Sequence, residues 1–299
     1  MANISSELIL QLLFSGITLG CIYGLVAIGF NIIYNATGII NFAQGEFVML
    51  GGMCAVWLES KVGLPLYLVF PGAVLMVTII GIIFERLIIR PIKNPNILSL
   101  VIVTIGVSIF LKGLVMIIWG KQTFVLSHFT SENPIIIGGA SILPQDIWVL
   151  GVTVAIVLIL GFFFEKTILG KAIRACAFNK KAASLVGISV PRMVMISFAL
   201  SAAVGAAGGV VVTPITLMSY DGGTMLALKG FSAAILGGLG NSFGGVIAGF
   251  IIGIMEQLTA GIISSHYKDA VALVVLLFVL FVKPSGLLGG SEASKLKKF

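Results

Sequence analysis

The stretch GITLGCIYGLVAIGFNIIYNATGIINFAQGEFVMLGG, residues 16–52, decides the fold class of this chain. It contains two apolar runs joined by a polar segment at 31–46, and the first run extends upstream to residue 8. A bilayer core requires about 20 apolar residues for each helical pass. Two such runs around a short polar segment predict two membrane-spanning helices.

The whole chain has the composition of a membrane protein. Of its 299 residues, 59% are hydrophobic and 10% are charged, and the mean hydropathy is +1.17. Soluble domains carry about 25% charged residues. This composition excludes a soluble globular protein, a disordered chain and a nucleic-acid binder, despite a net charge of +7. We therefore expect an all-α, polytopic membrane protein whose surroundings are lipid bilayer and not nucleic acid.

Apolar runs bounded by charged residues give the candidate spans. They lie at 8–34, 39–58, 66–84, 97–119, 146–164, 193–217, 224–239, 242–263 and 269–282. Basic residues gather in the segments 85–95 and 165–192 and in the tail 284–299, which the positive-inside rule places in the cytoplasm.

The Gly-rich stretch GGTMLALKGFSAAILGGLG at 222–240 decides the number of crossings. An even number of crossings separates two cytoplasmic segments, so this stretch has to count as a crossing. We interpret it as a broken crossing inside the molecule, because it is short and Lys229 interrupts it. The result is a single transmembrane domain, 1–299, with eight or nine spans and with the side of its N-terminus left open.

Glycines repeat at intervals of four residues in two of these spans. Such faces let helix backbones approach closely where lipid gives no hydrophobic drive for association. We expect static packing at these faces, with sliding during a transport cycle as the alternative. The repeats are Gly16, Gly20 and Gly24 in the first span and Gly245, Gly249 and Gly253 near the end of the chain.

Catalytic chemistry finds no support in the sequence. The two histidines, His128 and His266, are isolated, the three cysteines lie far apart, and no Gly-Lys-Ser or Gly-Lys-Thr phosphate loop occurs. We expect a protein that is not an enzyme and carries no metal or cofactor. Its energy source is then another chain or an ion gradient.

A few polar side chains interrupt the apolar spans. Asn41, Gln44 and Glu46 are candidates for a translocation path, because a carboxylate at bilayer depth costs about 2.5–3.5 kcal/mol and faces a bundle interior or a pathway. The competing interpretation is a capped helix start, with Glu46 favoured by the helix dipole. For Lys112 we expect snorkelling toward the membrane surface.

Deep acidic residues near the C-terminus can also be paired. Glu256 lies deep in the run 242–263, and Asp221 lies beside a glycine pair. Either carboxylate can pair with Lys229, a choice that the sequence leaves open.

The segment GKAIRACAFNKKAASLVGISVPRM, residues 170–193, predicts a short surface helix. Asn179 is a favourable N-cap and Gly187 a favourable residue just beyond the C-terminus. Ala182, Leu185 and Val186 form a small apolar face among basic residues, which suits insertion into a cleft on a partner protein. A solvated basic loop that only sets topology is the alternative.

The chain resembles the permease subunits of branched-chain amino acid ABC importers. The resemblance runs nearly from end to end, and one departure is Gln44, where that family commonly has His. It rests on residues 16–52 quoted above and on RACAFNKKAASLVGIS (174–189), LKGFSAAILGGLGNSFGGVIAGFIIGIMEQL (228–258) and YKDAVALVVLLFVLFVKPSGLLG (267–289).

The resemblance implies a type II-like importer permease in a bacterial inner membrane. Its implied partners are a second, homologous permease in a heterodimer, two cytoplasmic ATP-binding subunits, and an extracellular or periplasmic solute-binding protein. Within the cytoplasmic coupling loop, 165–192, it implies that the residues facing the ATPase are Gly170, Arg174, Asn179, Ala182, Ala183, Leu185 and Gly187.

A rival from another class is an ion-coupled secondary transporter or channel for small amino acids or amides. It would bind its coupling ion at Glu46, Asp221 or Glu256, beside a broken helix. The absence of an acidic pair within one apolar span argues against it.

Overall fold

A computed structural model describes residues 6–92 and 96–289, and this part of the chain is mainly helical. Lys93 and residues 290–299 of the predicted basic tail lie outside the described residues. The long elements, in chain order, are α1 (Ser6–Thr37), α2 (Gln44–Ser60), α3 (Leu66–Phe84) with a π-helical extension η1 (Glu85–Ile89), α4 (Ile97–Trp119), α5 (Pro144–Lys166), α8 (Val190–Thr216), α9 (Gly222–Gly237), α10 (Ser242–Ile262) and α11 (Lys268–Val282).

Each predicted span coincides with one of these helices. In the described part of the chain, seven helices are long and apolar enough to cross a membrane, when η1 is counted with α3 and the 3-10 turn Ser265–Tyr267 with α11. Helices α2 and α9 are shorter than these spans, with 17 and 16 residues. The chain is thus a multi-pass helical membrane protein. The second span begins at Gln44 and not at residue 39, because Gly38 leaves the helix with a φ of 76° and a nonhelical segment follows.

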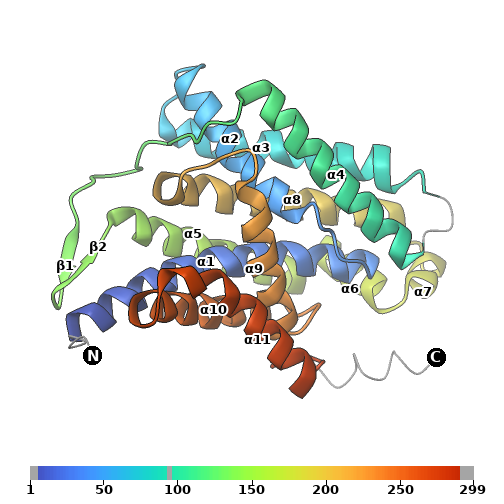
Figure 1. Cartoon of the computed structure of the whole chain (residues 1–299). Helices are drawn as coiled ribbons and strands as arrows, with labels where there is room; N and C mark the ends of the chain where they lie inside the picture. The colour runs from blue at the N-terminus through green and yellow to red at the C-terminus, as the bar shows by residue number, and fades with distance from the viewer. Residues whose placement is uncertain (1–5, 93–95, 290–299) are drawn as a thin grey trace.

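The remaining elements mark the two ends of the bundle. The hairpin of β1 (Ile135–Ile137) and β2 (Ala140–Ile142) lies at one end, and the short helices α6 (Ile168–Phe178) and α7 (Lys180–Leu185) lie at the other (Figure 1). Gln11 near the start of α1 exchanges two hydrogen bonds with the backbone of Ser141 in the hairpin. The positive-inside rule predicts that the basic α6–α7 end faces the cytoplasm, and this orientation would place the first described turn of α1 on the outer side.

The two glycine stripes meet each other. Helices α1 and α10 lie side by side and antiparallel, with Gly16 against Ile254 and Gly24 against Val246. A Cβ atom on Gly249 would overlap the backbone of α1, so a side chain there would force the helices apart. The prediction of tight packing at these faces is confirmed, and α1 is one unbroken helix of 32 residues.

Helix α2 forms the centre of the molecule, and 14 of its 17 residues are buried. It packs on α8, where Gly51 lies against Ala206 and a Cβ atom on Gly209 would overlap the carbonyl of Val48. The segment that carries the three predicted path residues therefore enters the middle of the protein.

Helix α9 corrects one prediction, because it is continuous from Gly222 to Gly237. It runs steeply across α1 and α10 in Figure 1. Its glycines remain helical because each one packs on a neighbour: Gly223 on Gly45 of α2, Gly230 on Val26 of α1, and Gly237 on Gly244 of α10. The irregular backbone lies on either side of this helix and not within it.

Candidate functional site

The polar residues before and within the first turn of α2 are locked into the bundle. Gln44 is fully buried, and its amide donates to the carbonyl of Ser201 on α8 at 3.3 Å. Ser201 Oγ lies 2.6 Å from Gln44 Oε1 and 2.8 Å from the carbonyl oxygen of Gly29, so its single proton serves one acceptor at a time. This position therefore uses an uncharged hydrogen-bonding group to join α1, α2 and α8.

Asn41 shapes the backbone that leads into α2. Its Oδ1 accepts a hydrogen bond from the amide of Ala43 at 3.1 Å, while its Nδ2 is buried without a partner among the described residues. An unpaired buried amide costs about 1–3 kcal/mol, which makes this nitrogen a strong donor toward anything that reaches it.

Glu46 lies in the first turn of α2 and is 1% exposed. Its Oε1 accepts a hydrogen bond from Ser108 Oγ at 2.8 Å and lies 3.9 Å from Lys112 Nζ. Lys112 in turn donates to Thr224 Oγ1 at 3.1 Å. These four residues, which we call the Glu46 cluster, connect α2, α4 and α9.

The Glu46 cluster contains a polar seam that the sequence did not reveal. The prediction that Lys112 snorkels toward the membrane surface is wrong, because its ammonium points inward to Thr224 and Glu46. Pairing offsets part of the cost of burying either charge. Glu46 Oε2 has no partner among the described residues, and the Lys112 side chain is 25% exposed, so the cluster has unused polar capacity.

A second charged cluster joins α1, α9, α10 and α11. Lys229 Nζ lies 2.6 Å from Glu256 Oε1 and 2.7 Å from Asp269 Oδ1. Tyr23 donates its hydroxyl proton to Glu256 Oε2 at 2.8 Å, and the Lys229 ammonium lies 5.5 Å from the centre of the Tyr23 ring. We call these four residues the Lys229 cluster.

The sequence anticipated one of these partners and missed the others. The pairing of Lys229 with Glu256 is confirmed, whereas Asp221 accepts a hydrogen bond from Ser219 instead. Asp269 was visible as the acidic residue that opens the last apolar run, but its spacing did not indicate which helix it would meet.

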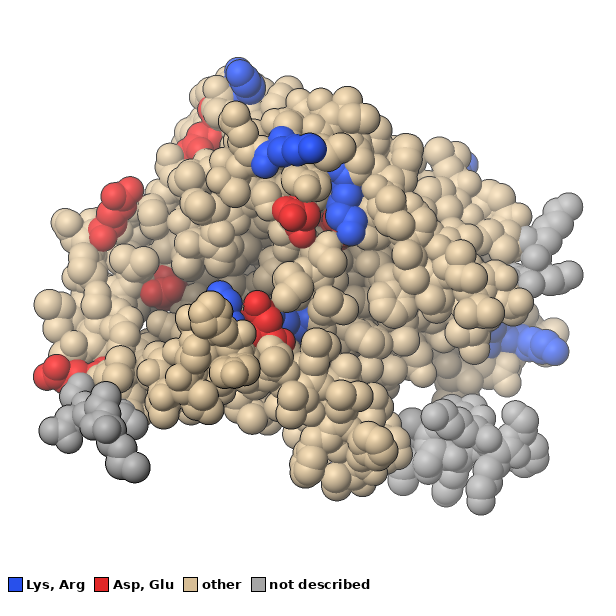
Figure 2. All heavy atoms as spheres, in the orientation of Figure 1, with Lys and Arg blue, Asp and Glu red and all other residues tan. Residues whose placement is uncertain are grey.

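One face of the molecule carries charged side chains near its middle. Figure 2, which looks onto α4, α9 and α11, shows acidic and basic side chains around a hollow near the middle of a mostly uncharged surface. Other exposed positions on the same helices are apolar, such as Ile117 on α4 and Phe281 on α11. A charged hollow is unsuited to contact with the hydrocarbon core of a bilayer.

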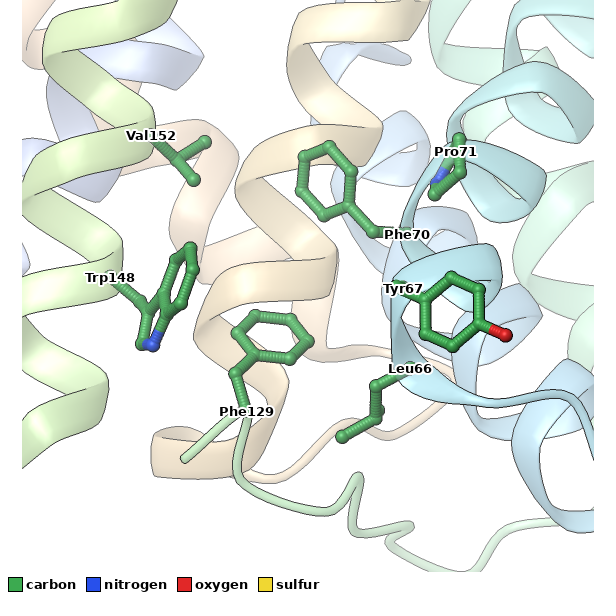
Figure 3. A pocket seen from close by; sticks show the side chains of 7 residues that line it. All are labelled: Leu66, Tyr67, Phe70, Pro71, Phe129, Trp148 and Val152. Atoms are coloured by element: carbon green, nitrogen blue, oxygen red, sulfur yellow. The ribbon is translucent and has the colours of Figure 1, made fainter. Parts of the chain in front are cut away.

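An apolar pocket elsewhere on the protein has a different character. It measures about 480 Å³ and lies between α3, α5 and the segment 120–134 (Figure 3). Phe129 and Trp148 pack edge to face on one side of it, with ring centres 5.9 Å apart, and α3 with Tyr67 lies on the other side. Its lining is apolar, so it lacks the converging polar groups that fix a polar ligand.

At the α6–α7 end of the bundle, the predicted surface helix is present as α7. Asn179 Oδ1 accepts a hydrogen bond from the amide of Ala182 at 3.0 Å, and Gly187 has a φ of 86°. Both capping predictions are confirmed. The preceding helix α6 begins in the same way, with Thr167 Oγ1 accepting from the amide of Gly170.

The predicted coupling residues divide into an outer and an inner set. Leu185 and Val186 are 88% and 76% exposed. Ala183, in contrast, is 4% exposed and packs against Ile173, Cys176 and Met193. The outer set also includes Arg174, Asn179, Ala182 and Gly187, whereas Gly170 is buried against the end of α5.

A hydrogen bond also ties α7 to the end of α1. Lys180 Nζ donates to the carbonyl oxygen of Thr37, the last residue of α1, at 2.6 Å. The segment after Thr37 leads directly through Asn41 into α2. Lys180 therefore bonds α7 to the end of the helix that precedes the polar segment at the centre of the protein.

Metal chemistry has no evident location in the described part of the chain. Within residues 6–92 and 96–289, no group of three or more His, Cys, Asp or Glu side chains is placed to hold a metal ion. Cys21, Cys54 and Cys176 are buried free thiols.

Comparison with known proteins agrees with this geometry. Residues 12–280 match the family described as "Branched-chain amino acid transport system / permease component". The chain is 36% identical to the high-affinity branched-chain amino acid transport system permease protein LivH of Escherichia coli, over 96% of this chain and 97% of that protein. It is 32% identical to the corresponding protein BraD of Pseudomonas aeruginosa, over 96% and 98%. It is also 28% identical to the ribose import permease protein RbsC of Haemophilus influenzae, over 86% and 80%.

Proposed function

The chain belongs to the family of branched-chain amino acid transport permease components, and on this premise we propose that it is the transmembrane permease subunit of an ATP-driven importer for leucine, isoleucine or valine. It forms half of the translocation pathway and carries out no chemical reaction itself. ATP hydrolysis takes place on separate cytoplasmic subunits.

The observation that carries this proposal is the α6–α7 hairpin. It presents the exposed apolar side chains of Leu185 and Val186 toward the cytoplasm. Neighbouring apolar side chains that are exposed to water are stabilised when a partner protein buries them. A cleft on an ATPase subunit would bury them. Lys180 supplies the mechanical connection, because it holds α7 to the end of α1.

The path through the membrane is assigned to Asn41, Gln44 and Glu46. The unpaired Nδ2 of Asn41 and Oε2 of Glu46 support this assignment, since each retains hydrogen-bonding capacity in a buried position. Gln44 acts through Ser201 to set the position of α2 relative to α8.

The complete importer has further subunits. A second, homologous permease forms a heterodimer with this chain, two ATP-binding subunits bind in the cytoplasm, and an extracellular or periplasmic binding protein delivers the solute. Its location is the bacterial inner membrane. The charged face over α4, α9 and α11 supports a partner or pathway on that side, because lipid contact there is costly.

The decisive experiment replaces Ala182 with Glu in the assembled importer. Ala182 is exposed, so the fold should persist while the bulky charge prevents α7 from entering a cleft. We expect loss of ATP-dependent leucine uptake and of stimulated ATPase activity in proteoliposomes, with unchanged membrane insertion.

The matched control is Ala177→Glu, an exposed alanine on α6 of the same hairpin. It should leave uptake within about twofold of the wild type. Normal coupled uptake by Ala182→Glu, or concentrative uptake by the purified chain alone under an ion gradient, would contradict the proposal. Ala183→Glu is not a clean test, because Ala183 is buried and the substitution would disrupt the hairpin.

A further inference from the structure

A polar cleft of about 360 Å³ lies beside the Lys229 cluster. It is bounded by the start of α9, by the start of α11 and by Thr123 in the segment that follows α4. Phe124 in that segment pairs with Met218 through two backbone hydrogen bonds, which closes one side of the cleft. Since the segment leads to the β1–β2 hairpin, the cleft lies on the outer side, from which an importer takes its solute.

The charges around this cleft have both signs and sum to zero. Lys229, Lys268 and Asp269 line it, and Glu256 lies behind Lys229. Among the described residues, Lys229 contacts the two carboxylates of Glu256 and Asp269, which leaves one of its three ammonium protons for a ligand. A ligand with one positive and one negative group would match this arrangement, whereas an ion of single charge would leave one sign unpaired.

The remaining wall of the cleft is apolar. Met225 and Leu226 lie on the first turns of α9, and Met218 precedes that helix. Methionine side chains adapt readily to ligands of varied shape. The volume falls near the lower end of the range for small-molecule pockets, about 300–1,000 Å³, so one small solute fits.

We propose that this cleft binds the main-chain groups of an α-amino acid, with the carboxylate on Lys229 and Lys268 and the ammonium on Asp269. The solute's carboxylate replaces Asp269 on Lys229, and its apolar side chain contacts Met225 and Leu226. Asp269 can make this exchange because its side chain is 46% exposed, whereas Glu256 stays in place behind Lys229. The assignment rests on the proposed function, as it names the outer recognition site of that transport pathway.

Cysteine labelling measures occupation of the cleft independently of transport. The native cysteines are buried, so a Thr123→Cys variant of the assembled importer should be the one labelled by a membrane-impermeant maleimide. We expect leucine to slow this labelling at least fivefold. Two analogues, 4-methylpentanoate without the ammonium and isopentylamine without the carboxylate, should protect at least tenfold more weakly.

The Asp269→Asn substitution then tests the charge exchange. It should raise the leucine concentration needed for protection at least tenfold and raise the KM for uptake. Asp269→Glu keeps the carboxylate, so both values should stay close to those of the wild type. Glu132→Gln is the control, because Glu132 is an outer carboxylate that is 79% exposed and does not line the cleft. If Asp269→Asn leaves the labelling rate of Thr123→Cys without leucine unchanged, the Asp269→Asn variant keeps its fold.

Two failures remain distinguishable. If wild-type proteoliposomes show no ATP-dependent uptake, the proposed function is wrong. Suppose instead that they take up leucine. If leucine then protects the cysteine equally well with and without Asp269→Asn, or if both analogues protect it as well as leucine does, the assignment of the cleft is overturned and the proposed function stands.

Discussion

The two buried lysine clusters differ in how tightly they are built. Lys229 contacts two carboxylates at 2.6 and 2.7 Å and is 7% exposed. Lys112 lies 3.9 Å from Glu46, with its side chain 25% exposed, and its closest partner is the hydroxyl of Thr224. The first cluster is a compact network across four helices, whereas the second is a loose polar seam between α4, α9 and the central α2.

This difference indicates that the Lys229 cluster holds helices together and that the Glu46 cluster permits movement. A tight buried ion pair leaves an uncompensated charge when one partner is removed, so the Lys229–Glu256 pair has to persist throughout a transport cycle. A loose pair with spare acceptors can exchange partners at little cost. We infer that α9, α10 and α11 move together, and that the seam at Glu46 is where the path opens.

The largest effect is expected at Glu256. Glu256→Ala removes the buried acceptor of both Lys229 and Tyr23, and breaking a buried pair in this way costs about 3–5 kcal/mol. The variant should be poorly recovered as folded protein, as measured by thermal denaturation in detergent followed by size-exclusion chromatography. Stability equal to the wild type would refute the holding role.

A smaller loss is expected for Tyr23→Phe. This change removes only the hydrogen bond to Glu256 and keeps the ring beside Lys229. A hydrogen bond to a charged group contributes about 1.5–3 kcal/mol, so the melting temperature should fall by less than in Glu256→Ala. Tyr34→Phe on the same helix is the control, because no hydrogen bond of the Tyr34 hydroxyl is found among the described residues. An equal fall in melting temperature in both tyrosine variants would show that the Tyr23 hydroxyl does not stabilise the Lys229 cluster.

Features that depend on local sequence were predictable. The helix positions follow from apolar runs, and the caps of α7 follow from Asn179 and Gly187, since a cap involves residues three or four positions apart. Close packing at the glycine stripes was also predicted, although the sequence did not indicate that the two stripes pack on each other.

Features that depend on which helices meet were not predictable. Glu46 and Lys112 are 66 residues apart by their numbers, and no spacing rule connects residues of different helices. Lys112 was visible in the sequence as a charge inside an apolar run. Such a charge indicates an energetic cost of burial, but it does not indicate which residue will pair with it. The burial of Ala183 and Gly170 was missed for the same reason, because it depends on Met193 of α8 and the end of α5.

Glu46→Gln should separate transport from stability. The amide keeps the size of the side chain and can still accept from Ser108, so the melting temperature should change little. Loss of the carboxylate at the seam should slow leucine uptake about tenfold, equivalent to about 1.4 kcal/mol in the barrier. The measurement is initial uptake rate against internal ATP concentration. Unchanged uptake would reduce Glu46 to a residue that only starts α2.

The smallest change in stability is expected for Lys112→Met, and it is the sharpest test of the comparison. Partly exposed ion pairs contribute about 0–1 kcal/mol, and Glu46 retains its bond to Ser108 when Lys112 is absent. Lys229→Met, the matched substitution, leaves Glu256 and Asp269 facing each other without a cation and should behave like Glu256→Ala. Thermal denaturation of both variants side by side measures the difference. If Lys112→Met destabilises the protein as much as Lys229→Met, the Glu46 cluster is as rigid as the Lys229 cluster, and the inference that the path opens at Glu46 is wrong.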